Sequence, residues 1–274
     1  MIYELNRAQF PNISHLLNGE LINLAIKAVV EGYNPGWIFV DNIENPKTAM
    51  IWSKGIKGFY FVGEANNLDF NNNINMYINK EILPRAQKLG LETFEFSGTS
   101  QEWDENFKLI FRNRNIRISK QFVYKHNNIE NISFDNLKLE GEYVLKQVDE
   151  DLLKSNQYNL QFVKSAIYEW WDSIEDFIKY GIGFCILHKD TAVCSCITSF
   201  MIDISMECHI KTLEKYRKKG LATRAVGEFV KYCKDNQYVP HWDCMEENFG
   251  SRALADKCGY NKEFEYFLYD FNLR

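Results

Sequence analysis

The 274-residue sequence has no run of about 20 consecutive apolar residues, the length that a membrane-spanning helix needs. Its N-terminus lacks a basic start followed by an apolar stretch, which is the pattern of a secretory signal peptide. We therefore expect a soluble protein that stays in the cytoplasm.

Cysteine is absent from the first half, and no two cysteines form a CxxC pair. The seven cysteines lie between residues 185 and 258, mostly within apolar stretches where a free thiol behaves as a small hydrophobic side chain. Cys194 and Cys196 flank a single serine, but two thiols without nearby histidine or carboxylate ligands make a poor zinc site. We expect neither a disulfide framework nor a bound metal ion.

Basic side chains are outnumbered, with 32 lysines and arginines against 37 acidic residues, so the net charge is -5. This balance argues against an electrostatic grip on nucleic acid or on an anionic membrane. A nucleic-acid alternative rests on five basic residues whose spacing is more typical of a solvated face: Arg112, Arg114, Arg117, Lys120 and Lys125. The 46% hydrophobic residues exclude intrinsic disorder.

The length is about twice the ~150 residues of a typical domain, and helical and strand-like patterns alternate through both halves of the chain. A polar, asparagine-rich stretch between residues 126 and 135 predicts a linker. We expect an N-terminal α/β domain at residues 1–130 and a second domain at residues 136–274.

The most informative segment follows a predicted strand that ends near residue 212. A helix begins around Leu221, and its apolar residues recur at intervals of four. Arg217, Lys218 and Lys219 precede this helix, where its dipole would favour acidic residues. Gly220 removes a Cβ from the turn, and the free amides of a helix N-terminus bind anions. The segment predicts a pyrophosphate cradle, and the alternative is a tight turn with solvated basic residues.

These residues resemble the acetyl-CoA motif of the GNAT N-acetyltransferase superfamily, which runs from a strand through Arg/Gln-x-x-Gly-x-Gly/Ala into a helix. The motif matches residues 217–222, and residues 248–260 are similar to the second motif, an Asn-started helix that ends at a glycine and an aromatic. A finer resemblance is to the bacterial subgroup that includes the zwittermicin-resistance acetyltransferase. The resemblance implies an α/β (α+β) fold with a mixed, mostly antiparallel sheet flanked by helices.

The resemblance also implies an acetyl-CoA-dependent N-acetyltransferase that modifies the amine of a small molecule. Main-chain amides of the cradle would hold the pyrophosphate, the strand before it would pair with the pantetheine, and the second motif would approach the far end of the pantetheine. The implied cofactor-binding residues are Ile210, Thr212, Leu213, Arg217, Lys218, Lys219, Gly220, Leu221, Ala222, Thr223, Asn248 and Ser251. Asn248 could instead serve only as a helix cap, and Ser251 could simply face solvent.

Acetyl transfer needs a base to remove a proton from the amine. Glu207 and His209 share one face of an unbulged strand, while Met206 and Cys208 take the other and should face the core. We rank Glu207 first as the base, directly or through water, and His209 second. A bulge would shift these faces, and a solvated edge pair is the alternative.

Ala255 stands where many members of the superfamily carry a tyrosine that protonates the leaving thiolate. The identity of the acid is therefore open, and a non-catalytic acyl-CoA-binding or regulatory module is the alternative function.

The first half repeats the coarse order of strands and helices of the second half but has no basic glycine turn between residues 61 and 74. Our hypothesis is a degenerate copy of the same fold that has lost cofactor binding and shapes the acceptor pocket. The alternative is an unrelated α/β cap.

Overall fold

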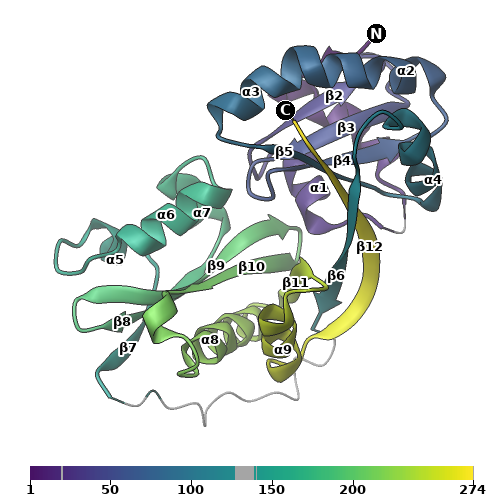
Figure 1. Cartoon of the computed structure of the whole chain (residues 1–274). Helices are drawn as coiled ribbons and strands as arrows, with labels where there is room; N and C mark the ends of the chain where they lie inside the picture. The colour runs from purple at the N-terminus through teal and green to yellow at the C-terminus, as the bar shows by residue number, and fades with distance from the viewer. Residues whose placement is uncertain (20, 127–138, 140, 274) are drawn as a thin grey trace. The chain divides into compact units, whose positions relative to one another are not determined.

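The computed structural model describes residues 1–19, 21–126, 139 and 141–273. The chain divides into two compact units, labelled by their elements in Figure 1. Unit 1 consists of Met1–Gln121 and Phe264–Arg274, and unit 2 of Phe122–Glu263. Apart from its first residue, the expected linker lies outside the described residues.

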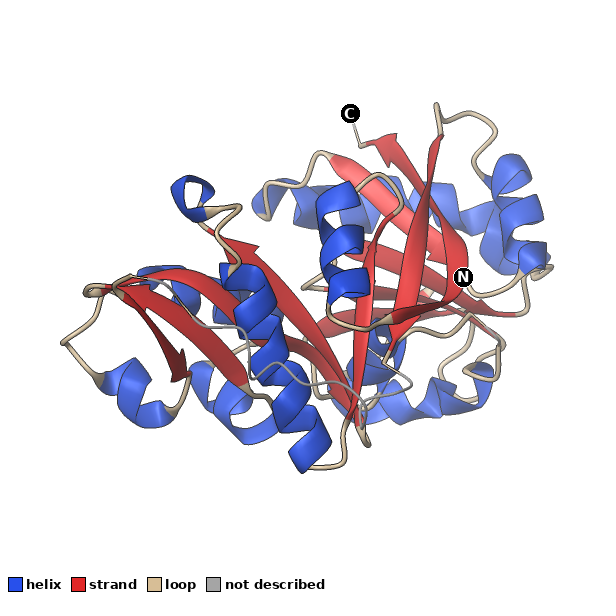
Figure 2. Cartoon of the chain, turned by 90° about the horizontal axis from the view of Figure 1, so that it is seen from below, coloured by secondary structure: helices blue, strands red, loops and turns tan. Residues whose placement is uncertain are grey.

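Unit 1 is built on a mixed sheet in which β1 to β4 pair antiparallel, β5 runs parallel to β4, and β12 pairs antiparallel with β5. Helices flank this sheet (Figure 2). The strands are β1 (Tyr3–Glu4), β2 (Gly36–Val40), β3 (Thr48–Ser53), β4 (Gly58–Gly63), β5 (Thr93–Gly98), β6 (Arg117–Lys125) and β12 (Asn261–Asn272), of which the last two continue into unit 2. The helices are α1 (Leu24–Val30), α2 (Leu68–Tyr77), α3 (Leu83–Lys88) and α4 (Gln101–Ile110), with a 3-10 segment at Arg7–Leu16 and a π-helical turn at Ile78–Ile82.

The core of unit 1 is aromatic, and it explains why the end of the chain belongs there. Phe271 of β12 stacks on Phe94 with the ring centroids 5.1 Å apart, and Tyr269 stacks on Phe96 at 5.4 Å. Both residues of β12 are buried. The sequence-based boundary, which kept residues 264–274 in the second domain, therefore differs from the division of the structure.

Three consecutive asparagines, residues 71–73, lie inside α2. The side chain of Asn67 caps this helix by accepting from the amide of Phe70 at 3.1 Å. Asn71 donates to the carbonyl of Ala65 at 2.7 Å, so a residue with low helix propensity is used here for a side-chain contact. Pro84 is the second residue of α3, within the first turn, where its missing amide costs no helical hydrogen bond.

The part of the sheet that lies in unit 2 is also mixed: β7 to β10 pair antiparallel, and β11 runs parallel to β10. Helices α8 and α9 lie on one side of this sheet, and α6 and α7 lie on the other (Figure 1). The strands are β7 (Tyr143–Gln147), β8 (Gly183–His188), β9 (Thr191–Ile202), β10 (Ser205–Thr212) and β11 (Val239–Met245). The helices are α5 (Glu150–Lys154), α6 (Gln161–Trp170), α7 (Ile174–Tyr180), α8 (Leu221–Asp235) and α9 (Phe249–Lys257), and a 3-10 turn spans Glu214–Tyr216.

The periodicity of α8 predicts its buried face correctly. Leu221, Ala225, Phe229 and Cys233 are all buried in the core of unit 2. At the end of α9, Gly259 has φ 85°, so it ends the helix in the left-handed conformation that glycine favours.

The two units share the order and direction of their strands. Four antiparallel neighbours followed by one parallel strand describe β1 to β5 and equally β7 to β11. In each unit a helix then leads from the parallel strand to a long strand, α4 to β6 and α9 to β12. This repetition supports the hypothesis of a degenerate copy over that of an unrelated cap.

Glu95 generates a prediction for the pH dependence of stability. It lies opposite Asp270 on the neighbouring strand, and burial, with a smaller contribution from the Asp270 charge, raises the pKa of Glu95 from 4.5 to about 7. Between those two pH values the folded chain holds a proton that the unfolded chain releases, so stability falls as the pH rises.

Glu95→Gln removes this penalty. The variant should be more stable than the wild type at pH 8 by about 1–3 kcal/mol, and this gain should shrink to near zero at pH 4. Urea unfolding at both pH values measures the difference, and Glu92→Gln, at an exposed position nearby, is the control. An equal effect of Glu95→Gln at both pH values would contradict the assignment.

Candidate active site

The predicted cradle lies between the end of β10 and the start of α8. Lys218 and Gly220 both adopt left-handed backbone conformations, with φ 61° and 73°. Alternating conformations of this kind turn neighbouring amides toward one side, where they form an anion-binding concavity. No side chain caps α8, and its first turn holds no acidic residue. The first amides of α8 are therefore available to a ligand.

A cavity opens directly in front of this backbone. A Cβ placed on Gly220 would meet no atom within 4 Å, so the space it faces is open. The cavity has a volume of about 470 Å³, and its charged lining residues are Arg217, Lys218 and Lys257. All three are basic, so the site suits an anionic group held by both main-chain amides and positive side chains.

The structure brings together most, but not all, of the predicted cofactor residues. Those that line the cavity are Thr212, Arg217, Lys218, Gly220, Leu221, Ala222 and Thr223. Ile210 and Leu213 pack against the hydrophobic core instead. The Lys219 ammonium donates to the hydroxyl of Tyr143 at 3.2 Å and does not line the cavity.

The second motif contributes a different face of α9 from the one expected. Asn248 caps α9 by accepting from the amide of Ser251, and the Ser251 hydroxyl accepts from the Trp242 indole at 2.9 Å. Neither side chain lines the cavity. The opposite wall is formed instead by Gly250, Ala253, Leu254 and Lys257. Their spacing of three and four residues was the signal in the sequence that could have identified this face.

Strands β10 and β11 pair only at their beginnings. Within the described residues, the parallel ladder runs from Ser205 to Glu207 on β10 and stops there, opposite His241. Beyond this point no strand of the described residues pairs with the edge of β10 that faces β11. This leaves main-chain groups of residues 208–212 available to an extended ligand.

Glu207 and His209 lie on the face predicted for them. Met206 and Cys208 belong to the core that contains α8, so the alternating side chains point to the other face. A bulge is present, but its extra residue is Ser199 on β9, and the alternation along β10 is preserved. The Ser199 hydroxyl donates to the carbonyl of Glu207 at 3.1 Å.

Two residues of β11 join this face, and sequence reasoning did not assign them a role. His241 is the register partner of Glu207, and Asp243 follows two residues later. Glu207 is only 7% exposed. Burial raises the pKa of Glu207 well above its usual range, and the negative charge of Asp243 raises it further, while the hydrogen bond from Ser199 opposes both.

His209 has the opposite electrostatic character. Its ring lies 5.0 Å from the ring of Trp170, and its Nε2 atom is buried with no hydrogen-bond partner among the described residues. Burial lowers the pKa of His209, the charge of Glu169 opposes this, and Lys211 adds to it. A neutral imidazole with an unpartnered nitrogen has the chemistry to accept a proton.

A model of the GNAT acetyltransferase family matches residues 14–269. The chain belongs to this family. The expected fold class and the expectation of an acetyltransferase enzyme are thereby confirmed.

Known proteins are similar to this GNAT acetyltransferase over nearly its whole length. A protein named "Uncharacterized N-acetyltransferase YdfB" of Bacillus subtilis (strain 168) is 29% identical over 273 residues, 98% of each chain. The structure of a GCN5-related N-acetyltransferase-like protein from Streptococcus suis 89/1591 has a TM-score of 0.65 at 19% identity, covering 96% of this chain and 98% of the other. A tandem GNAT protein from the clavulanic acid biosynthesis pathway has a TM-score of 0.63 at 9% identity, covering 100% and 98%. The two solved structures show that the fold, with both halves, is shared.

This GNAT acetyltransferase has no tyrosine at the position where many members of the superfamily place one. Ala255 is 0% exposed and packs in the core of unit 2. Tyr260, five residues further along the chain, is also a core residue, and burial raises the pKa of its hydroxyl well above the usual range. Neither residue offers a proton donor to the cavity.

The first half of the GNAT acetyltransferase has no counterpart of the cradle at the corresponding helix. The N-terminus of α2 is capped by Asn67, and Asp69 lies in its first turn. The Asn67 side chain already accepts from a backbone amide that an anion would use, and the negative charge of Asp69 would repel an anion. The structure agrees with the expectation that the first half lacks the anion-binding turn.

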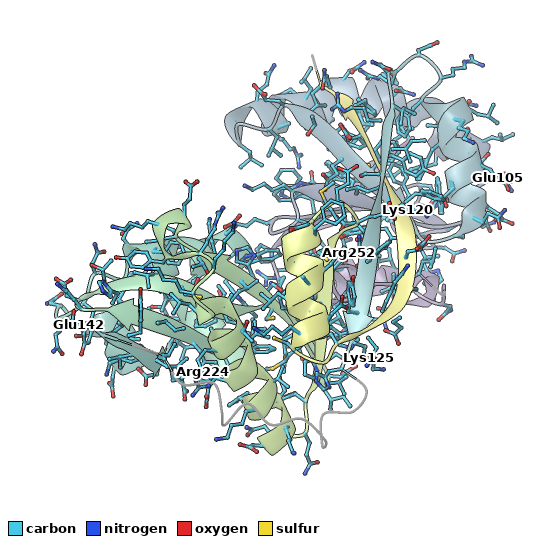
Figure 3. All side chains as sticks on the ribbon, turned by 60° about the horizontal axis from the view of Figure 1, so that its bottom comes forward. Glu105, Lys120, Lys125, Glu142, Arg224 and Arg252 are labelled. Carbon is cyan, nitrogen blue, oxygen red and sulfur yellow. The ribbon has the colours of Figure 1, made fainter. Side chains whose placement is uncertain are left out.

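Three of the five basic residues on which the nucleic-acid alternative rests form ion pairs with carboxylates. Lys120 and Lys125, labelled in Figure 3, form ion pairs with Glu265 at 2.7 Å and with Glu263 at 3.8 Å. Arg117 pairs with Asp270. No helix of the described residues has the length and apolar character to cross a membrane, and no cluster of three metal-ligating side chains occurs among them.

The effect of the Asp243 charge on the pKa of Glu207 can be measured directly. Asp243→Asn removes the neighbouring negative charge, so the pKa of Glu207 should fall while staying above the usual range because burial remains. A pH titration of ¹³C-labelled glutamate carboxyls, with Glu207→Gln to assign the signal, gives the value. Glu169→Gln is the control, because it removes a charge that acts on His209. An unchanged Glu207 titration in Asp243→Asn would show that Asp243 has no such effect.

Proposed function

We propose that the protein is an acetyl-CoA-dependent N-acetyltransferase that transfers the acetyl group to the amine of a small molecule by direct attack. The observation that carries the proposal is the uncapped N-terminus of α8, which has left-handed residues before it and a basic cavity in front of it. Such a site fits a diphosphate better than a neutral or cationic group.

Acetyl-CoA supplies an activated acetyl thioester, and three parts of unit 2 would hold it. The amides of residues 218–223 would bind the pyrophosphate, and Arg217 and Lys257 would neutralise its charge. The free edge of β10 at residues 210–213 would pair with the pantetheine as an added strand does. The face of α9 that carries Gly250, Ala253 and Leu254 would form the opposite wall, and Asn248 and Ser251, which lie outside the cavity, could approach only the far end of the pantetheine.

Glu207 would act as the base. An acceptor ammonium must lose a proton before it can attack, and the ionised carboxylate of Glu207 can receive it directly or through water. The raised pKa makes this carboxylate more basic than an exposed glutamate, and Asp243 contributes to that shift. His209, with its unused Nε2, is the second candidate.

The departing thiolate would leave without a proton donor at position 255. Ala255 is an apolar core residue, and the CoA thiolate is a good leaving group. The absence of a tyrosine there also supports the alternative, a non-catalytic acyl-CoA-binding or regulatory module. Free thiol release from acetyl-CoA with a panel of small amines separates the two: CoA binding without turnover of any amine would favour the module.

Gly220→Ala tests the cradle. Alanine at a positive φ costs about 1–2 kcal/mol of stability, and the added methyl would also enter the ligand's space. We expect CoA affinity, measured by calorimetry, to fall by at least about tenfold, which corresponds to 1.4 kcal/mol.

Gly90→Ala is the matched control, because Gly90 has φ 69° and equally open surroundings in unit 1. It should lose similar stability and keep its CoA affinity. Equal CoA affinity in both variants would exclude the cradle as the binding site.

Glu207→Gln tests the base. Its kcat should fall by about 10²-fold or more, while the affinity for CoA stays the same. In the wild type, kcat/KM should rise with pH as Glu207 ionises. Asp243→Asn should move this rise to lower pH, because it lowers the pKa of Glu207.

Glu169→Gln separates the two base candidates with the same acceptor. It should leave the pH profile in place if Glu207 is the base, and move it to lower pH if His209 is the base, because Glu169 raises the pKa of His209. If the pH profile of kcat/KM shifts in Glu169→Gln but not in Asp243→Asn, the base is His209 and not Glu207.

A further inference from the structure

Side chains of the edge strand β7 and of its neighbour β8 contact the segment that leads into α8. Tyr143 on β7 and His188 on β8 are direct register partners, with ring centroids 5.0 Å apart. Tyr216, just before the cradle, lies 5.4 Å from the His188 ring and 6.4 Å from the Tyr143 ring. Glu142, labelled in Figure 3, lies just before β7 and marks this edge. We refer to Tyr143, His188, Tyr216 and Lys219 as the edge cluster.

Polar contacts reinforce the rings of the edge cluster. The Tyr216 hydroxyl lies 3.4 Å from Nδ1 of His188. The Lys219 ammonium donates to the Tyr143 hydroxyl at 3.2 Å and lies 5.4 Å from the Tyr216 ring centroid. Lys219 therefore joins two tyrosines, and its positive charge rests on aromatic faces.

The edge cluster fixes the chain on both sides of a strained residue. Lys218 is a non-glycine residue at φ 61°, between Tyr216 and Lys219 in the sequence. Such a conformation persists only where the surroundings determine it. The contacts of Tyr216 and Lys219 join this segment to β7 and β8, and a hydrogen bond from Arg217 Nε to the carbonyl of Thr212 at 3.4 Å also ties it to the end of β10.

We propose that Tyr143 and His188 are positioning residues, which preset the amides of residues 218–220 for a diphosphate by holding Tyr216 and Lys219. The inference rests on the proposed function, in which this backbone binds the pyrophosphate of acetyl-CoA. Neither Tyr143 nor His188 lines the cavity, so they act through the cradle and not on the ligand. Preorganisation of this kind increases affinity by reducing the ordering that binding requires.

The test compares ligands that carry different parts of CoA. Tyr143→Phe removes only the acceptor of Lys219, and His188→Asn removes the ring beside Tyr216. Each variant should weaken CoA and 3′-dephospho-CoA alike, by about three- to tenfold, because each breaks one hydrogen bond or ring contact. Binding of pantetheine, which has no diphosphate, should not change. The KM for acetyl-CoA should rise while kcat at saturation is kept.

Two controls keep the result specific. Tyr168→Phe, at a tyrosine that is 49% exposed on α6, should match the wild type for every ligand. Lys219→Met should weaken CoA by itself, and adding Tyr143→Phe to it should cause no further loss, because Tyr143 acts through Lys219. Thermal unfolding of each variant identifies any loss that comes from misfolding, and Tyr143→Phe retains the ring for that reason.

Three outcomes would overturn the proposal. CoA affinities equal to the wild type in both Tyr143→Phe and His188→Asn would show that the edge cluster does not position the cradle. A loss confined to CoA, with 3′-dephospho-CoA unaffected, would show a direct contact with the 3′-phosphate. An additive loss in the Lys219→Met double variant would break the link through Lys219. A wild-type protein that binds no CoA would instead refute the proposed function itself.

Discussion

The backbone between β10 and α8 is the constraint on which the rest of the proposed site depends. Two left-handed residues, Lys218 and Gly220, end the strand segment in a turn that leaves the first amides of α8 without a cap. An uncapped helix start is unfavourable unless something else satisfies its amides. A diphosphate can do so, and the basic residues at the rim of the cavity support that ligand over any neutral one.

The proposed base lies on the opposite face of the sheet from α8, on the same strand that leads toward the cradle. The β10–β11 ladder stops at Glu207, so the strand edge that follows is free for a ligand that extends from the cradle. Glu207 stands at the point where the ladder ends, buried and close to the charge of Asp243. The proposed base therefore lies where the β10–β11 ladder ends, so a ligand that extended along this edge from the cradle would pass close to it.

Features that depend on residues close together in the sequence could be predicted. Features that depend on contacts between distant segments could not. The cradle, the Asn248 cap, the Gly259 helix end and the buried face of α8 follow from residues within one or two turns of each other. The bulge at Ser199, the approach of Asp243 to Glu207 and the wall formed by Gly250 and Lys257 depend on register between distant segments.

The same distinction explains the end of the chain. Nothing local to residues 264–274 indicates that Tyr269 and Phe271 stack on rings of β5, because that choice depends on the aromatic core of unit 1. The resemblance to the zwittermicin-resistance subgroup stays a prediction, since the named relatives do not bear on it. The repeated strand order, by contrast, makes the first half comparable with the second, and Asn67 and Asp69 mark where the two differ.

A crystal structure of the protein with acetyl-CoA is the most direct test of the central claim, which is that one half of the chain binds the cofactor through the N-terminus of α8. The account predicts pyrophosphate density against the amides of residues 218–223, with the thioester near Glu207 and none at the N-terminus of α2. Pyrophosphate bound at α2, or bound elsewhere with the α8 amides left free, would contradict it.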